Sequence, residues 1–195
     1  MAPPRKHQTD AILDATRTLV LAEGPRAASV AAIAAASGAP AGTLYHRFGN
    51  RDGVVAAAWL RALERFQSRA LAASGSDAVE SCVAMAVAAV GFARELPEDA
   101  RLLLTVRPAD LLDAEPDAAL QATLARMNAP LIARLDELTR ALYGRADPRA
   151  ADAVARAVVD LPYAVVRRHA GDDPLPEWLE VDVAVGVRAL LNGFG

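Results

Sequence analysis

The stretch SGAPAGTLYHRFGNRDG, residues Ser37 to Gly53, predicts the turn between two short helices and the second helix itself. Gly38 is typical of the residue just after a helix, and Pro40 is typical of the first residue of the next one. Upstream, Ser29 is expected to cap the helix VAAIAAAS, whose Val30 and Ile33 should face inward. The following helix should run from about Pro40 to Phe48. Two short helices around a glycine-containing turn are typical of a helix-turn-helix.

The second of these helices has two different faces. With about 100° per residue, Leu44 and Phe48 fall on one side together with Ala41, and we expect all three to pack inward. Hydroxyl groups commonly contact phosphates, and glycine allows another surface to approach closely. A face this compact fits the major groove of DNA, although a solvated face or a protein interface would use the same residues. The residues on this outer arc are Gly42, Thr43, Tyr45, His46 and Gly49.

The rest of the chain is expected to be helical as well, giving an all-α fold of about nine helices. The first helix should begin at a capping Thr9, after a loose segment over residues 1–8, and end at Glu23. We expect a head at residues 1–52 and a larger helical domain at 53–195. The further helices are expected over 52–73, 77–96, from Pro97, from Pro108, over 117–143 with a kink at Pro130, over 147–170 and over 176–192.

Composition and charge restrict the class of protein. The chain of 195 residues is 53 % hydrophobic, so a substantial core can form. No apolar run is long enough to span a membrane, and the N-terminus lacks the apolar core of a signal peptide, which together predict a soluble cytoplasmic protein. The single cysteine, Cys82, allows no intrachain disulfide and is expected to be a buried apolar residue.

The charge is unevenly distributed. Residues 1–51 carry six basic and three acidic side chains, a net charge of +3, which leaves −6 for the remainder because the whole chain carries −3. A basic head on an acidic body indicates a polyanionic partner for the head. The last two helices have more apolar residues than one core-facing stripe needs, so a second copy of the chain is the expected partner of the helices at 147–170 and 176–192.

The segment from Ile12 to Ala58 resembles the N-terminal domain of the TetR family of bacterial transcriptional regulators. The features that carry the resemblance are the sequence Ser-Val-x-x-Ile-Ala, a following glycine, and Gly-Thr-Leu-Tyr-His-x-Phe. The family combines a three-helix DNA-binding head with a divergent helical domain that binds a small molecule and dimerises. The resemblance therefore implies a repressor that leaves its DNA operator when a small effector binds.

The resemblance also implies roles for individual residues. Thr43, Tyr45 and His46 would face the major groove, Gly42 would allow close approach, and Ser29 would aim the second helix at a phosphate. Arg51 matches a frequent phosphate contact, and the basic Arg5 and Lys6 could add backbone contacts. Two departures weaken phosphate anchoring: Pro40 stands where the family often has a capping serine, and Ala41 where a basic residue is common.

The effector site is expected among the middle helices, but the sequence does not identify the effector. Large side chains and polar residues within apolar segments are the candidates, and each of the large ones is equally compatible with a plain core role. The candidate ligand-binding residues are Trp59, Met85, Phe92, Thr105, Met127, Asn128 and Tyr163. No cofactor and no metal ion are expected.

An enzyme is not favoured, because the three histidines are far apart in sequence and there is no His-x-x-x-His, Cys-x-x-Cys or glycine-rich phosphate loop. The alternative that stays open is a helical small-molecule-binding or adaptor protein whose helix-turn-helix does not bind DNA.

Overall fold

The computed structural model describes residues 5–106 and 118–194, with side chains from residue 8 to 106 and from 120 to 194. Every regular element in this part of the chain is helical, which confirms the all-α fold class. The chain divides into two compact units: a head unit, residues 1–63 and 98–117, and a body unit, residues 64–97 and 118–195. The helix expected from Pro108 lies outside the described residues. The functional boundary expected between residues 52 and 53 stays a prediction.

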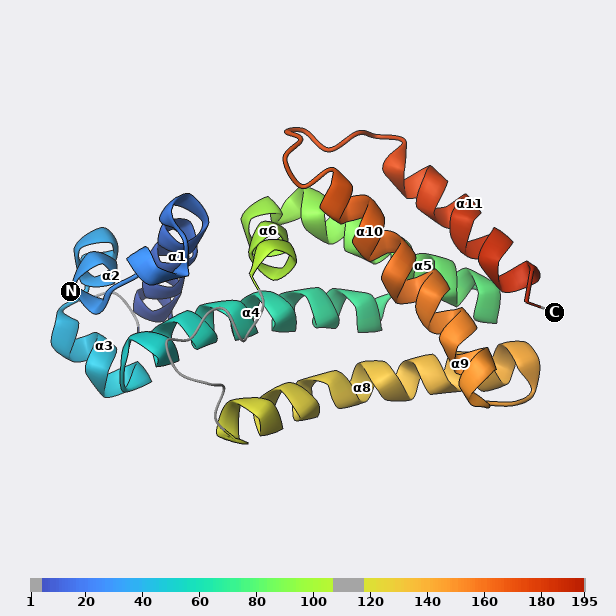
Figure 1. The fold of residues 1–195 in the computed structure, drawn as a ribbon, viewed down its shortest axis with the longest axis horizontal. Helices are drawn as coiled ribbons and strands as arrows, with labels where there is room; N and C mark the ends of the chain where they lie inside the picture. The colour runs from blue at the N-terminus through green and yellow to red at the C-terminus, as the bar shows by residue number, and fades with distance from the viewer. Residues whose placement is uncertain (1–4, 107–117, 195) are drawn as a thin grey trace. The chain divides into compact units, whose positions relative to one another are not determined.

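Among the described residues, the head unit consists of six helical segments, three of which are short and follow one another directly (Figure 1). The expectation that the first helix begins at Thr9 is wrong, because α1 already begins at Arg5. The polar residues before Thr9 are compatible with a helix, and the Thr9 hydroxyl accepts a hydrogen bond from Arg47 at 2.7 Å instead of capping. The elements are α1 (Arg5–Glu23), the 3-10 turn η1 (Pro25–Ala27), α2 (Val30–Ser37), α3 (Ala41–Phe48), the first half of α4 (Arg51–Ala72), and α6 (Pro97–Thr105).

One apolar cluster holds the head unit together. Ile12 of α1, Ile33 of α2 and Leu44 of α3 are all buried in it with Val54 and Val55 of α4. The cluster also contains Leu102 and Val106, which are far away in sequence. Burying a large aliphatic side chain contributes roughly 1.5–3 kcal/mol, so these contacts are the main stabilisation of the helix-turn-helix. The sixth helix therefore belongs to the core of the head unit.

Polar contacts fix α6 to the same core. Arg17 of α1 donates hydrogen bonds to the carboxylates of Glu98 and Asp99, and Asp99 is only 1 % exposed. Burial lowers the pKa of Arg17, but its hydrogen bond to Asp99 and the charges of the neighbouring carboxylates outweigh that effect, so the pKa is raised overall. The Trp59 indole N–H donates to the carbonyl oxygen of Val106 at 3.0 Å. The two ends of α6 are thus tied to α1 and α4 within the head unit.

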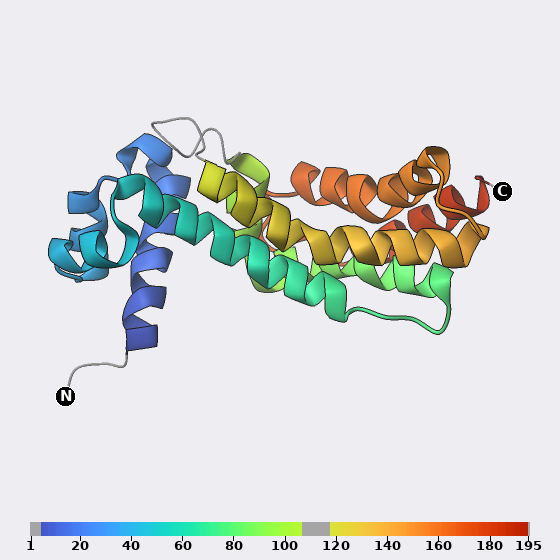
Figure 2. The same cartoon turned by 90° about the horizontal axis from the view of Figure 1, so that it is seen from below.

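The body unit is a bundle around α5 (Figure 2). Helix α5 packs against α8, α10 and α11. Asp77 caps its N-terminus by accepting a hydrogen bond from the Glu80 N–H at 2.9 Å. Besides the end of α4, the elements are α5 (Ala78–Glu95), α8 (Ala118–Tyr143), α9 (Pro148–Ala155), the π-helical turn η2 (Arg156–Asp160), α10 (Leu161–Arg168) and α11 (Leu179–Asn192).

Two prolines in helices of the body unit are accommodated differently. Helix α8 runs as one helix from Ala118 to Tyr143 with Pro130 inside it, as the apolar spacing predicted. Pro162 instead follows the π-helical turn η2. Such a turn changes the backbone hydrogen-bond pattern just before the proline, which has no N–H group to donate. The helix expected over 176–192 begins later, at Leu179.

Because Arg17 pairs with the buried Asp99, replacing Asp99 should destabilise the fold more than replacing its neighbour Glu98. Asp99→Ala should lower the free energy of unfolding by about 2–3 kcal/mol, because it leaves a largely buried guanidinium with fewer partners. Glu98→Ala is the matched control and should cost less than about 1 kcal/mol, because Glu98 is 47 % exposed. Urea unfolding measures both. Equal effects of the two variants would show that α6 is not held by the buried pair.

Candidate nucleic-acid interface

The orientation of α3 is set by its apolar side. Leu44 is 1 % exposed and Phe48 packs partly buried against the head core, as predicted. The expectation that Ala41 packs inward with them is wrong, because Ala41 is exposed. Ala41 is the first residue of the helix, where the chain has only just turned toward the core. A helix of eight residues is not stable alone, so the burial of Leu44 determines which face of α3 looks outward.

The outward face of α3 carries the residues that the sequence singled out. Tyr45 is 56 % exposed, His46 and Gly42 are exposed, and Thr43 is half-buried. These side chains offer two hydroxyls and an imidazole on neighbouring turns of one short helix. They form a polar surface that another molecule can reach, which we call the α3 face: Gly42, Thr43, Tyr45 and His46.

The glycines around α3 are there for different reasons. Gly38 has a φ of 68° and Gly49 a φ of 79°, so both occupy the left-handed region where side chains are strained. Gly42 has no such restriction, and a Cβ atom placed on it would meet no heavy atom within 4 Å. The head unit itself does not require glycine at position 42. Its presence fits a surface that a partner approaches closely.

The second helix is capped as the sequence predicted. The Ser29 hydroxyl accepts a hydrogen bond from the Ala32 N–H at 3.1 Å, and Ser29 itself is exposed. Val30 is half-buried and Ile33 fully buried, so α2 faces the core in the expected way. The remaining N–H groups at the first turn of α2 are suited to hold an anion such as a phosphate.

Much of the positive charge of the head is already paired. Arg17 is shared among Asp14, Glu98 and Asp99. Arg51 donates to the carboxylate of Asp52 at 2.6 Å and to the carbonyl oxygen of Pro25, and its side chain is 14 % exposed. A phosphate contact by Arg51 would therefore compete with these partners. The basic excess of residues 1–51 is not concentrated on the α3 face.

Two residues that position α3 were not found by sequence reasoning. Arg47 donates to the Thr9 hydroxyl at 2.7 Å and to the Gln8 amide oxygen at 3.2 Å, which connects α3 to α1. Gly53 lies so close to α3 that an added Cβ would stand 1.9 Å from the Phe48 carbonyl oxygen. The sequence did contain a signal for Gly53, because glycine is a poor helix former and is unusual in the first turn of a helix unless close packing requires it. The partners of Arg47 gave no sequence signal.

The predicted ligand-binding residues fall in different places. Trp59 and Thr105 belong to the head unit, where the Thr105 hydroxyl donates to the Arg101 carbonyl oxygen at 2.6 Å. Met85 and Phe92 are buried in the body unit, whereas Tyr163 is 45 % exposed. Met127 and Asn128 are half-buried on α8. The Asn128 amide oxygen accepts a hydrogen bond from Gln67 at 2.7 Å, and Gln67 is a buried polar residue of α4.

Several other chemistries have no support in the described part of the chain. Cys82 is buried and burial raises the pKa of its thiol to about 11, so it is an apolar core residue as predicted. Among the described residues, no group of three His, Cys, Asp or Glu side chains is placed to hold a metal ion. Within the same residues no helix combines the length and apolar character that crossing a membrane requires.

The comparisons with known proteins agree with this geometry. Residues 12–58 match the family model of bacterial regulatory proteins of the tetR family, and this segment contains α2, α3 and the start of α4. No curated protein matches the chain in sequence. The resemblance expected from the Ile12–Ala58 segment is thereby confirmed.

Solved structures share the fold over nearly the whole chain. A TetR family transcription regulator from Marinobacter aquaeolei VT8 matches with a TM-score of 0.74 at 19 % identity, covering 96 % of this chain and 95 % of that one. The fatty acid degradation regulator FadR from Bacillus halodurans matches with a TM-score of 0.71 at 20 % identity, covering 94 % and 98 %. FadR from Bacillus subtilis, solved in complex with stearoyl-CoA, gives 0.71 at 15 % identity with the same coverages, 94 % and 98 %.

Gly42 allows the interface to be tested separately from the fold. Gly42→Ala should raise the free energy of unfolding by about 0.5–1 kcal/mol, because alanine favours helix and has open space there. The same variant should bind duplex DNA more weakly, because the methyl group stands on the α3 face. Thermal unfolding and fluorescence anisotropy with the DNA upstream of the coding sequence measure the two effects.

Gly38→Ala is the matched control, because it adds the same methyl group to a glycine in the turn that precedes α3. It should lower stability by about 1–2 kcal/mol, since alanine is strained at a φ of 68°. A Gly42→Ala protein that is more stable and binds DNA as well as the parent would remove this position from the interface.

Proposed function

The N-terminal domain of this chain belongs to the TetR family of bacterial regulatory proteins, and from that premise we propose a ligand-responsive DNA-binding transcriptional regulator. The protein is a repressor that leaves its operator when a small molecule binds the body unit. The observation that carries the proposal is the α3 face, an accessible polar surface on a helix whose apolar side is anchored by Leu44. Such a face fits the major groove, which is about 12 Å wide.

Each residue of the interface has a role that its chemistry allows. Tyr45 and His46 contact phosphates and base edges at the rim of the groove, and Thr43 contacts them from the half-buried side. Gly42 lets the helix backbone come close to the duplex. Ser29 holds the first turn of α2 in a form that presents its N–H groups to a phosphate. Arg51 reaches a phosphate by exchanging its present partners Asp52 and Pro25.

The effector binds among the helices of the body unit. Met85, Phe92 and Met127 supply apolar walls, and the Gln67–Asn128 hydrogen bond supplies a polar pair on α4 and α8. The Gln67 amide is buried and is costly to leave unpaired, so a ligand that opens this hydrogen bond must offer matching donors and acceptors. Stearoyl-CoA, the ligand of the similar FadR from Bacillus subtilis, is the first compound to test. Trp59 and Thr105 are not assigned to this site, because both are engaged within the head unit.

The signal travels along the chain where it passes from one unit to the other, within α4 and at the junction between α5 and α6. Helix α4 begins in the head unit and ends in the body unit, and α6 follows directly after α5 of the body. The Arg17–Asp99 pair and the Trp59–Val106 hydrogen bond attach α6 to the head. A ligand that prefers one arrangement of these helices shifts the population of heads that can bind DNA. The shift cannot exceed the ligand's preference between the two arrangements.

The protein acts as a dimer through its last helices. Val159 and Tyr163 near α10, and Val181 and Val185 of α11, are exposed apolar residues. The two helices approach closely, because a Cβ on Gly186 would stand 2.8 Å from the Leu161 side chain. Their exposed side chains thus combine into one apolar patch, a feature that monomeric proteins rarely leave uncovered. A dimer places two α3 faces on successive major grooves, about 34 Å apart.

No enzymatic activity is assigned to the protein. The competing candidate is a small-molecule-binding adaptor whose helix-turn-helix no longer binds DNA, and the paired state of Arg17 and Arg51 is the observation that favours it. The two candidates differ in one measurable property, which is affinity for duplex DNA.

Tyr45→Ala tests the function directly. The substitution should weaken binding to DNA from the upstream region by about 1–3 kcal/mol, the usual value of a specific contact. Affinity should also fall steeply with salt, because phosphate contacts release counterions. Fluorescence anisotropy at one fixed salt concentration, followed by a salt series, gives both values.

Ile132→Ala is the matched control, because Ile132 is 57 % exposed and lies on α8 of the body unit. It should leave DNA affinity unchanged. A parent protein that binds no upstream DNA would favour the adaptor instead. Repeating the titration with stearoyl-CoA, or with any compound that raises the melting temperature, tests whether a ligand releases the DNA.

The apolar patch gives a prediction about assembly. Val185→Asp should convert the dimer to a monomer, because it places a charge in a surface that the partner covers, while Val185 is 60 % exposed within the single chain. The monomer should keep its helical content and lose about tenfold or more in DNA affinity, since the two half-sites are no longer linked. Sedimentation velocity measures the assembly, and Ile132→Asp is the control. A dimeric Val185→Asp protein would place the interface elsewhere.

A further inference from the structure

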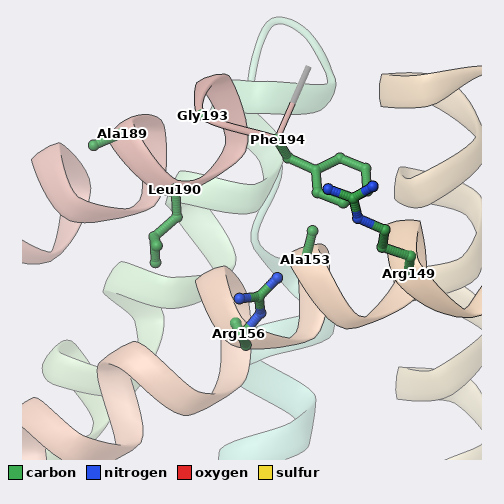
Figure 3. Close-up of a pocket in the computed structure, with 7 residues that line it drawn as sticks. All are labelled: Arg149, Ala153, Arg156, Ala189, Leu190, Gly193 and Phe194. Carbon is green, nitrogen blue, oxygen red and sulfur yellow. The ribbon is translucent and has the colours of Figure 1, made fainter.

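A cleft opens in the body unit between the α9–η2 segment and the C-terminal end of α11 (Figure 3). Its volume is about 330 Å³, which lies at the lower end of the range for small-molecule sites. One side is formed by Arg149, Ala153 and Arg156, and the other by Ala189, Leu190, Gly193 and Phe194. None of these residues belongs to the α3 face or to the predicted effector site.

The hollow follows from the residues that the sequence places there. Arg149, Ala153 and Arg156 are spaced by four and three residues, so they share one side of the helix. The central position holds only a methyl group, and the facing end of α11 contributes Ala189 and Gly193. Small side chains opposite one another leave space between the helices, and the two arginines stand at either end of it.

The cleft is positively charged. No carboxylate is among its lining residues, which include two arginines. The Arg149 guanidinium lies beside the Phe194 ring (Figure 3), 5.2 Å from its centroid. Among the described residues it forms no ion pair with a carboxylate. Arg156 pairs with Asp152 through its Nε atom at 2.9 Å, which leaves its terminal nitrogens to face the cleft. Guanidinium N–H groups that are not already paired with a carboxylate are strong hydrogen-bond donors to one.

The cleft also has an apolar part. Leu190 is 42 % exposed beside it, and Phe194 presents its ring under Arg149. The ring is held from the other side by Tyr143, with the two ring centroids 4.8 Å apart. Cations and an apolar surface together select for a molecule that carries both an anionic group and a hydrophobic one.

We propose that this cleft is a binding site for a small organic carboxylate with a compact apolar or aromatic group. The carboxylate accepts hydrogen bonds from Arg149 and Arg156, and the apolar group lies against Leu190 and Phe194. The proposed site shares no residue with the α3 face or with the effector site, so carboxylate binding can be measured without DNA and without an effector.

The first test compares two ligands that differ only in charge. Phenylacetate should bind to the full-length protein in isothermal titration calorimetry, and phenylacetamide, which has nearly the same shape, should bind at least about tenfold more weakly. Equal binding of the two would overturn the proposal, because the arginines would then contribute nothing. No binding of phenylacetate at millimolar concentrations would overturn it as well.

The second test locates the site. Arg149→Gln and Arg156→Gln should each weaken phenylacetate binding by about tenfold or more. Arg145→Gln is the matched control, because Arg145 lies 6.0 Å from the Phe194 centroid but does not line the cleft and pairs with Asp147. It should change binding less than about twofold. All three side chains are exposed, so melting temperatures should stay near that of the parent. Unchanged binding in both cleft variants would place the carboxylate elsewhere and end the proposal.

Discussion

The burial of Leu44 is the interaction on which the functional surface depends. Helix α3 has eight residues and cannot maintain its own conformation in water, so its place is determined by what it buries. With Leu44 fixed in the cluster of α1, α2 and α4, the opposite side of the helix must face outward. The chain then has no freedom to rotate the helix, because the Gly53 backbone lies directly against the Phe48 carbonyl. Core packing and a tight junction together determine the direction of the α3 face.

The second constraint is the membership of α6 in the head unit. A helix that follows α5 of the body would be expected to pack with the body, yet Leu102 and Val106 are part of the head core and Asp99 is buried against Arg17. Breaking that attachment would expose apolar surface and leave a charge without its partner, and both effects are costly. The head core therefore holds both α4 and α6, and of these two helices α4 extends into the body unit. A movement of α4 must change the head or break its contacts with this core.

The sequence predicted the local features well and the distant ones poorly. The cap at Ser29 and the helix end at Gly38 depend on a few neighbouring residues, and both were confirmed. The Arg17–Asp99 pair joins residues 82 positions apart, and no periodicity reveals it. The start of α1 was misplaced because threonine is a common capping residue, whereas the Thr9 hydroxyl accepts a hydrogen bond from Arg47. The predicted ligand residues were selected by size and polarity, which do not tell a pocket wall from a core contact or from an exposed side chain such as Tyr163.

Leu190 connects the two surfaces inferred for the body unit. It lines the arginine cleft, and it is also an exposed apolar residue of α11, the helix that carries Val181 and Val185. A partner chain that covers α11 must therefore alter the environment of the cleft. Thermodynamic reciprocity then requires that a carboxylate bound in the cleft changes the dimer affinity by the same factor by which dimer formation changes the carboxylate affinity. The sign depends on whether the partner encloses the ligand or displaces it. In either case the two equilibria are linked, because one leucine side chain serves both surfaces.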